Sequence, residues 1–334
     1  MKPLYHRAAA ALLSFSVAAA AAAAAFSLHA NAQVRADFPA KPVRLVVPFA
    51  PGGSTDILAR ILSKNLYPQA GQAMVVENIA GAGGNIGANQ VAKAAPDGYT
   101  IEIGSVTTHA MNGSLYKQLP FDPIKDFDTV AMLAYVVNVI AVSPSLPVKT
   151  FPELIAHIRA NPGKVAYSSG GIGTHNHLTL ALLGKTAGLD LLHVPYKGGG
   201  PAVTALLQGE VQMFAGGASL LLPHAKGGKV RLIAVTEAAR SALLPDVPSV
   251  AETIPGFEVT NWYGVWGPRG LPPAVRASLN AEINRALSVP EVAQRLGEMG
   301  MVRSSLSPAQ LNEILQKDYV NWSATIKSLA IPAE

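Results

Sequence analysis

Three short segments combine glycines with polar residues in an order that suits the binding of an anion. They are Pro48–Asp56 (PFAPGGSTD), Ser168–His175 (SSGGIGTH) and Pro195–Pro201 (PYKGGGP). Each follows an apolar run typical of a strand and precedes a run with helical periodicity. Glycine lets the backbone approach a ligand closely, and the helix beyond presents free N–H groups and the positive end of its dipole. We therefore expect these turns to hold a carboxylate without an arginine.

The side chains of the three turns add hydroxyls and two charges. The hydroxyls belong to Ser54, Ser168, Ser169 and Thr174. Asp56 is either a first-turn acid that pairs with the helix dipole, which we favour, or an acceptor for the amino group of an amino acid. Lys197 is either an ordinary solvated lysine or a cation that attracts the distal acid group of a dicarboxylate. Both charges bear on which acids fit.

The residue patterns do not indicate metal binding or catalysis. His175 and His177 form an H-x-H pair, but at a helix start they lie ~200° apart and do not readily share one metal ion. The chain has no G-x-S-x-G elbow and no complete Walker loop. It has no cysteine, which excludes disulfides and thiol catalysis. We predict no catalytic residues, no metal site and no cofactor, so the protein is not expected to be an enzyme.

Residues 1–32 have the order of a secretory signal peptide. Lys2 and Arg7 make a basic start, Leu12–Phe26 is an uncharged, alanine-rich run, and Ala30-Asn31-Ala32 supplies the small residues of a cleavage site. The apolar run is shorter than the ~20 residues of a spanning helix. We expect cleavage after Ala32 and a soluble periplasmic protein.

Charge and composition narrow the choice of partners. Without residues 1–32 the formal net charge falls from +5 to +3, since two basic residues and no acidic ones are removed. No block of lysine or arginine is present, whereas a nucleic acid partner requires a clustered basic face. A composition of 49% hydrophobic and 14% charged residues is typical of a compact globular protein. We expect no nucleic acid partner, and nothing in the sequence requires assembly beyond a monomer.

Apolar runs alternate with segments of helical period, which predicts parallel sheets flanked by helices. We expect strands at 43–47, 74–77, 99–103, 165–169, 191–196, 211–215 and 230–236, and helices at 56–67, 86–94, 151–160, 175–187, 201–208 and 219–225. Three further helices are expected at 272–287, 290–298 and 308–329.

Two long apolar stretches predict crossings between two lobes. Val130–Val142 and Phe257–Trp266 are each long enough to run from one lobe to the other. We therefore predict that residues 37–137 plus 258–334 form lobe 1 and residues 138–257 form lobe 2. Trp262 and Tyr263 lie on the second crossing, where core packing is the default, although either ring could face the cleft and stack on a cyclic acid.

Several motifs together resemble one protein family. They are KPVRLVVPFAPGGSTDILAR, ENIAGAGGNIGANQVAKAAPDGYTI, SSGGIGTHNHL, VPYKGGGPAVTALLQGEVQMF and GKVRLIAVT. In this order they look like the successive motifs of the tripartite tricarboxylate transporter receptors, also called TctC or Bug solute-binding proteins. The similarity runs from about Pro39 to the C-terminus.

The resemblance implies a two-domain, type II-like periplasmic binding protein that closes like a flytrap over a small organic acid. The acid would be passed to inner-membrane permease subunits. A periplasmic sensor that docks on a signalling receptor uses the same lobes, and sequence alone does not separate the two. A secreted hydrolase is the less favoured third reading.

The resemblance also implies particular ligand-binding positions. Matching the family's motifs points to Phe49, Ala50, Gly53, Ser54, Asp56, Thr107, Thr108, His109, Ser168, Gly173 and Thr174. His109 is expected either at the cleft rim or against Tyr116 and Met111. One departure concerns Ala215–Ser219 (AGGAS), where relatives often carry an Asp or Asn; its absence is expected to enlarge the pocket or to remove a specificity contact.

Overall fold

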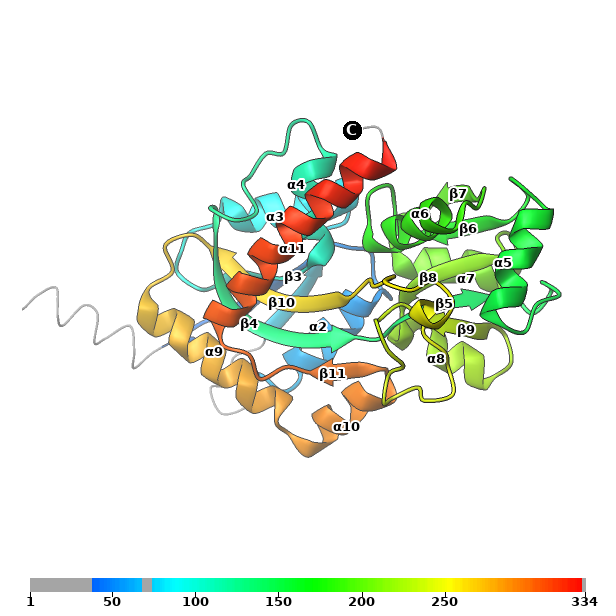
Figure 1. Ribbon diagram of the computed structural model, residues 1–334. Coiled ribbons are helices and arrows are strands. Elements are labelled where there is room, and N and C mark those ends of the chain that lie inside the picture. The colour runs from blue at the N-terminus through cyan, green and yellow to red at the C-terminus, as the bar shows by residue number, and fades with distance from the viewer. Residues whose placement is uncertain (1–37, 68–73, 332–334) are drawn as a thin grey trace, which may run out of the picture.

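The computed structural model describes residues 38–67 and 74–331. The signal peptide expected for residues 1–32 lies outside the described residues. Within the two described ranges, no helix combines the length and the apolar character needed to cross a membrane. The described chain forms two α/β lobes that lie side by side, each built on its own sheet (Figure 1).

The first lobe contains a six-stranded mixed sheet. Its strand order is β2 (Met74–Asn78), β1 (Val43–Val47), β3 (Thr100–Ser105), β10 (Asn261–Pro268), β4 (Phe127–Val136) and β11 (Met301–Arg303). Strand β1 is parallel to β2 and β3, whereas β10 is antiparallel to both of its neighbours and β11 is antiparallel to β4. Strand β11 was not predicted, because three residues are too few to show a strand period.

The second lobe contains a five-stranded mixed sheet. Its order is β7 (Leu192–Pro195), β6 (Ala166–Ser169), β8 (Met213–Gly217), β5 (Asn138–Val142) and β9 (Arg231–Val235). Strand β6 is parallel to β7 and β8, but β5 is antiparallel to β8 and β9. The prediction of purely parallel sheets was therefore wrong for both lobes.

The antiparallel strands β5 and β10 follow from the two crossings. Each crossing leaves one sheet at the carboxyl end of a strand, β4 or β9, and then enters the other sheet as an antiparallel strand. Within one sheet, an antiparallel strand begins at the edge where the mutually parallel strands end. The carboxyl edges of both sheets therefore face each other, and that edge is where open α/β sheets bind ligands.

The crossings themselves are short and well bonded. The stretch predicted as one strand over Val130–Val142 is two strands separated by Val137, whose N–H donates to Gly300 and whose carbonyl accepts from Ala218. The second predicted strand begins only at Asn261. Beside it, the Asn138 amide donates to the Thr236 hydroxyl at 2.8 Å, which ties the two crossings together. The lobe boundaries at 137/138 and 257/258 stay a proposal.

Lobe 1 carries most of the helices of the C-terminal third. Its helical segments are α2 (Ser54–Ser63), η1 (Ala82–Gly84), α3 (Asn85–Ala92), the π-helical η2 (Thr107–Met111), α4 (Asn112–Leu115), α9 (Pro273–Leu287), α10 (Pro290–Glu298) and α11 (Pro308–Leu329). Helix α11 crosses the front of the sheet in Figure 1. It begins with the predicted capping box of Ser307 and Gln310.

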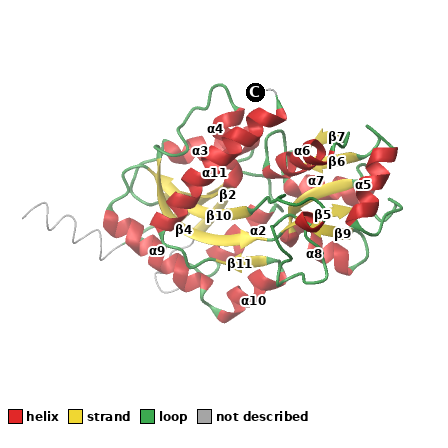
Figure 2. Cartoon of the chain, in the orientation of Figure 1, coloured by secondary structure: helices red, strands yellow, loops and turns green. Residues whose placement is uncertain are grey.

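Lobe 2 contains α5 (Phe151–Ala160), α6 (His175–Ala187), α7 (Gly199–Gln208), α8 (Ala218–Lys226) and η3 (Val250–Glu252) (Figure 2). Helices α6 and α7 end at left-handed Gly188 and Gly209, as their sequences predicted. The Thr150 side chain caps α5 by accepting from the Glu153 N–H, and the Glu153 carboxylate accepts from the Lys149 N–H.

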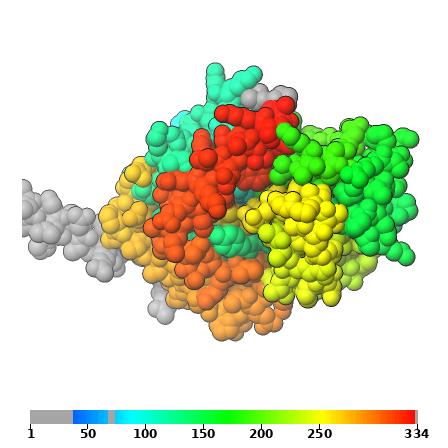
Figure 3. All heavy atoms as spheres, viewed as in Figure 1, coloured from blue at the N-terminus to red at the C-terminus, as the bar shows by residue number. Residues whose placement is uncertain are grey.

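Packing against the sheets leaves the lobes in contact. Helix α11 contacts both β4 of lobe 1 and α6 of lobe 2. In the space-filling view, the yellow segment that precedes β10 lies beside the red C-terminal helix on the face shown (Figure 3). Helix α11 and the segment before β10 therefore bring the two lobes into contact on this face of the molecule.

Candidate ligand-binding site

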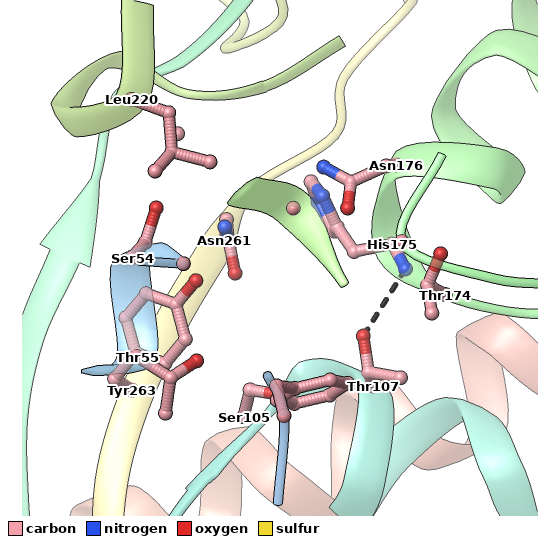
Figure 4. Close-up of a pocket in the computed structure, with 15 residues that line it drawn as sticks. Ser54, Thr55, Ser105, Thr107, Thr174, His175, Asn176, Leu220, Asn261 and Tyr263 are labelled. Atoms are coloured by element: carbon pink, nitrogen blue, oxygen red, sulfur yellow. Dashed lines mark hydrogen bonds between the residues drawn. The ribbon is translucent and has the colours of Figure 1, made fainter. Parts of the chain in front are cut away.

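A pocket lies between the lobes at the facing sheet edges (Figure 4). Its cavity volume is about 50 Å³. We call it the inner pocket, and its lining residues are Phe49, Gly53, Ser54, Thr55, Ser105, Thr107, Gly170, Thr174, His175, Asn176, Gly199, Gly217, Leu220, Asn261 and Tyr263. Both lobes contribute, so the pocket exists only when they approach each other.

Three helices start at the inner pocket. Helix α2 contributes Gly53–Thr55, α6 contributes Thr174–Asn176 and α7 contributes Gly199. The N-cap residues are Gly53, Thr174 and Gly198, and none of them caps its helix through a side chain. The N-cap side chains therefore satisfy none of the first-turn N–H groups. The His175 N–H of α6 donates to Thr107 instead, and the N–H groups without such a partner offer hydrogen bonds to a ligand.

The lining combines polar and apolar groups and contains no carboxylate, lysine or arginine among the described residues. Burial lowers the pKa of His175 to about 4, so its imidazole is neutral at neutral pH. Burial also raises the pKa of Tyr263, so the phenol keeps its proton. The positive potential of the pocket therefore comes from helix dipoles and N–H groups rather than from ionised side chains.

Direct contacts join the lobes around the pocket. The hydroxyls of Ser54 and Ser219 lie 2.8 Å apart. The N–H of His175 donates to the Thr107 hydroxyl of lobe 1 at 3.1 Å, drawn as the dashed line in Figure 4. Gly200 has no room for a Cβ, which would lie 3.1 Å from the Pro51 carbonyl. The glycine-rich turns thus allow backbone from opposite lobes to approach closely.

Five of the predicted ligand-binding residues line the inner pocket. They are Phe49, Gly53, Ser54, Thr107 and Thr174. Ala50 lies next to them against lobe 2, since a Cβ on Gly198 would approach the Ala50 Cβ to 3.2 Å. Whether these residues contact a ligand stays a prediction.

Asp56 does not line the inner pocket. Its carboxylate accepts hydrogen bonds from the Gly52 N–H at 2.9 Å, the Arg60 guanidinium at 3.0 Å and the Asn78 amide at 3.1 Å. Burial acts to raise the pKa of Asp56, but these bonds outweigh it and hold the pKa below its ordinary value. The geometry favours the structural alternative, in which Asp56 fixes the turn before α2.

His109 lies in the interior of lobe 1, not at the cleft rim. Its side chain is fully buried, its Nε2 lies 2.5 Å from Oε1 of Glu102, and its ring stacks on Trp266 with centroids 4.1 Å apart. This partner was not predicted, because Glu102 lies in the middle of β3 between Ile101 and Ile103, where a buried side chain is expected to be apolar. We leave His109 out of the proposed site.

Three other predicted residues make hydrogen bonds within the protein that stabilise the turns. The Thr108 hydroxyl accepts from the Ser105 N–H at 3.0 Å. The Ser168 hydroxyl donates to the Ala202 carbonyl at 2.8 Å. Gly173 has a φ of 72° and donates to His177 Nδ1 at 3.0 Å. None of the three lines the inner pocket.

Ser105, Asn261 and Tyr263 line the pocket but were not predicted as ligand-binding residues. Ser105 is the polar last residue of β3, a signal that could have been used. Asn261 and Tyr263 lie at the start of β10 on the second crossing, where core packing was the default expectation for Tyr263 although its ring could face the cleft. Trp262 points the other way and donates from its indole N–H to Asp318 at 2.7 Å.

A second cavity, the outer pocket, adjoins the inner one and shares Phe49 and Gly170 with it. Its remaining lining residues are Ala80, Gly81, Ala82, Gly83, Gly84, Tyr116, Gly171, Ile172, Pro195, Tyr196 and Lys197. Lys197 is the one charged residue among the described residues of this lining. The predicted cation therefore lies beside the inner pocket rather than in it.

Comparison with known families decides the identity of the fold. The family model of TctC, the tripartite tricarboxylate transporter family receptor, matches residues 58–331. This chain belongs to that family. The match confirms the resemblance that the glycine-rich motifs indicated.

Relatives of this receptor match along most of their length. A Pseudomonas sp. protein from the tcbD-tcbE intergenic region is 39% identical over 298 residues, covering 89% of this chain and 88% of that protein. BugT of Bordetella pertussis is 36% identical over 299 residues, covering 89% and 92%.

Solved structures share the whole fold. One described as a periplasmic transporter has a TM-score of 0.86 at 38% identity and covers 89% of this chain and 100% of that one. An R. palustris protein with adipate has a TM-score of 0.86 at 35% sequence identity, and the match covers 89% of this chain and 99% of that one. MatC from Rhodopseudomonas palustris with bound malate has a TM-score of 0.82 at 32% sequence identity, and the match covers 86% of this chain and 99% of that one. The predicted fold class is confirmed: this TctC receptor is a solute-binding protein with the two-lobed periplasmic binding protein fold.

The expected enlargement of the pocket at Ala215–Ser219 is not found at Gly217. A Cβ on Gly217 would lie 2.8 Å from the Ser54 hydroxyl and 2.9 Å from Val136 Cγ1. Lobe 1 thus occupies the space that a side chain would need. In this TctC receptor, glycine at 217 lets the start of α2 pack directly against β8.

Proposed function

We propose that this TctC receptor captures a small aliphatic dicarboxylate between its lobes in the periplasm and delivers it to a membrane permease. The observation that carries the proposal is the inner pocket, where three helices without side-chain caps begin around a lining that has no ionised side chain among the described residues. Such a site neutralises an anion through backbone N–H groups.

One carboxylate of the ligand would occupy the inner pocket. Each helix start near a carboxylate contributes about 0.3–1 kcal/mol, and more where the group is partly buried. Hydrogen bonds to an ionised carboxylate are also stronger than those between neutral groups. Three helix starts from two lobes provide this stabilisation only when the lobes are together, which couples capture to closure.

The second carboxylate would lie in the outer pocket near Lys197. The two cavities are neighbours, since Phe49 and Gly170 line both, and we propose that the ligand chain extends from one to the other. The solved relatives with adipate and with bound malate support a dicarboxylate, since each of those ligands carries two carboxylates. We therefore keep Lys197 as a proposed ligand-binding residue, at the distal end.

The family supports two further parts of the proposal, the transfer of the ligand to a permease and the periplasmic location of the protein. The family description names a receptor of a transporter, and a solved relative is described as periplasmic. Together with the basic, apolar and A-x-A order of residues 1–32, this supports export and transfer of the ligand to permease subunits. The same evidence supports binding without catalysis.

A thermal-shift panel tests the proposed ligand class. The chain without residues 1–32 would be heated with aliphatic dicarboxylates, tricarboxylates, acidic amino acids, aromatic acids, and the dimethyl ester of each dicarboxylate. A ligand at 100 times its Kd stabilises by about 2.7 kcal/mol, which corresponds to a rise in Tm of about 5 °C. We expect this rise with at least one dicarboxylate and none with its ester. Failure of every acid, confirmed by calorimetry, or equal shifts by acid and ester would contradict the proposal.

A further inference from the structure

His175 is held from three directions at the wall of the inner pocket. Its N–H donates to Thr107 across the lobes, its Nε2 lies 3.0 Å from the Thr260 carbonyl on the second crossing, and its ring meets Trp322 of α11 edge-on. The residue is only 4% exposed, yet it lines the pocket. The imidazole therefore has a fixed orientation.

These contacts fix the tautomer. A carbonyl oxygen only accepts hydrogen bonds, so Nε2 must carry the proton that is donated to Thr260. Because burial keeps the ring neutral, Nδ1 is left with a bare lone pair. Nδ1 is buried and has no partner within residues 38–67 and 74–331. A buried acceptor without a partner costs about 1–3 kcal/mol, so the site is incomplete without a donor.

The charged groups behind the ring do not supply that donor. Glu258, Lys317 and Asp318 line a separate cavity that also contains Thr260 and Trp322. Asp318 already accepts from the Trp262 indole N–H, and carboxylates have no proton to give at neutral pH. A ligand bound in the inner pocket can supply the missing donor.

A second unpartnered polar atom belongs to the same pocket. The hydroxyl of Ser105, at the end of β3, is buried and has no hydrogen-bond partner among the described residues. Ser105 is 3% exposed and lines the inner pocket from lobe 1, while His175 lines it from lobe 2. Figure 4 shows the two residues within one pocket lining, with Thr107 beside them.

The chemistry of these two atoms selects among functional groups. Nδ1 only accepts, whereas the Ser105 hydroxyl can donate, so a ligand hydroxyl, which both donates and accepts, can bond to either of them. A carboxylate oxygen would place an acceptor against the Nδ1 lone pair. An ammonium group would be buried without a carboxylate, because the described lining contains none.

We infer that the receptor is selective for hydroxylated acids, with His175 Nδ1 accepting the hydrogen bond of a ligand hydroxyl and the Ser105 hydroxyl bonding to a ligand oxygen from the side of lobe 1. The inference rests on the proposed function, since the carboxylates of the same ligand would still be held by the helix starts and by Lys197. It adds a specificity-determining residue, His175, and the class of acid that it selects.

Titration calorimetry on matched acids tests this inference. Malate and succinate differ only by a hydroxyl; 3-hydroxybutyrate with butyrate and mandelate with phenylacetate extend the test to other chain types. We expect the hydroxylated member of the tightest pair to bind about 10-fold more tightly than its unsubstituted partner, the value of one well-made hydrogen bond. Aspartate is expected to bind no better than succinate.

Variants identify the atoms responsible. His175→Phe keeps a ring against Trp322 but removes Nδ1, and Ser105→Ala removes the hydroxyl donor. Each is expected to reduce the preference for the hydroxylated acid, His175→Phe to nearly 1. His157→Phe, the same substitution on α5 away from either pocket, should leave the preference unchanged. Unfolding curves without ligand establish that each variant is folded.

The outcomes separate the two proposals. If acids bind but the hydroxyl gives no preference, or if the preference survives in both folded variants, the inference about His175 is overturned while the binding of carboxylates stands. If no acid of any pair binds to the wild-type chain, the proposed function fails and the inference fails with it. If His175→Phe does not fold, the preference of Ser105→Ala for the hydroxylated acid decides whether the inference stands.

Discussion

Among single residues, the hydrogen bonds within the protein separate supporting groups from groups that are available to a ligand. Asp56, Thr108 and Ser168 all have hydrogen-bond partners within their own lobe. Ser105 and His175 Nδ1 have none among the described residues. Sequence motifs identified the turns correctly, but residue type alone does not reveal which polar atoms the fold has already satisfied. Only the three-dimensional partners make that distinction.

Asp56 provides a direct test of this distinction. Asp56→Asn weakens the charge-assisted bonds to Arg60 and to the Gly52 N–H, so we expect the free energy of unfolding to fall by about 1 kcal/mol. The Kd for the best acid should not change, because Asp56 does not line either pocket. Urea unfolding and calorimetry measure the two quantities. A large loss of affinity with unchanged stability would show that Asp56 is a ligand-binding residue after all.

Among the helices and strands, the sequence predicted the elements better than their directions. Strands β1, β2 and β3 and helices α9, α10 and α11 lie within a few residues of the predicted ranges. Their signals are local: apolar runs, helical period and caps. The antiparallel direction of β5 and β10 was missed, because it depends on which edge of the second sheet the chain enters. Asn261 and Tyr263 reach the pocket because β10 starts at the carboxyl edge.

The two crossings contain a titratable group, Glu237, whose carboxylate accepts from the Asn138 N–H at 2.8 Å. Burial raises the pKa of Glu237 to about 7. Since the folded pKa lies above the ordinary value of 4.5, the folded state binds more protons than the unfolded state between pH 4.5 and 7. The group therefore lowers the stability of the protein as pH rises through this window, with no further loss above about 7.

Glu237→Gln removes this titration while keeping an acceptor for Asn138. Relative to the wild type, the variant should gain about 2 kcal/mol of unfolding free energy between pH 5 and pH 8. Comparing the two proteins at each pH cancels the contribution of the buried histidines, which both contain. Urea unfolding at several pH values measures the difference. A difference that is constant with pH would contradict a raised pKa for Glu237.

For the whole molecule, the arrangement of the sheets explains why one pocket can serve as a capture site. Both sheets present their carboxyl edges to the same space, so helix starts from both lobes face one ligand. The sequence predicted this meeting from the three glycine turns, and the inner pocket contains residues of all three. The sequence could not predict how closely the lobes approach, which depends on contacts such as Ser54 with Ser219 and on the room left at Gly217.

The most direct test of this account is a crystal structure of the receptor with the acid that gives the largest thermal shift. We predict one ligand per chain, with a carboxylate in the inner pocket bonded to N–H groups at the starts of α2, α6 and α7, and with the distal end toward Lys197. A carboxylate held mainly by lysine or arginine side chains, or bound outside the interface of the two lobes, would contradict the account.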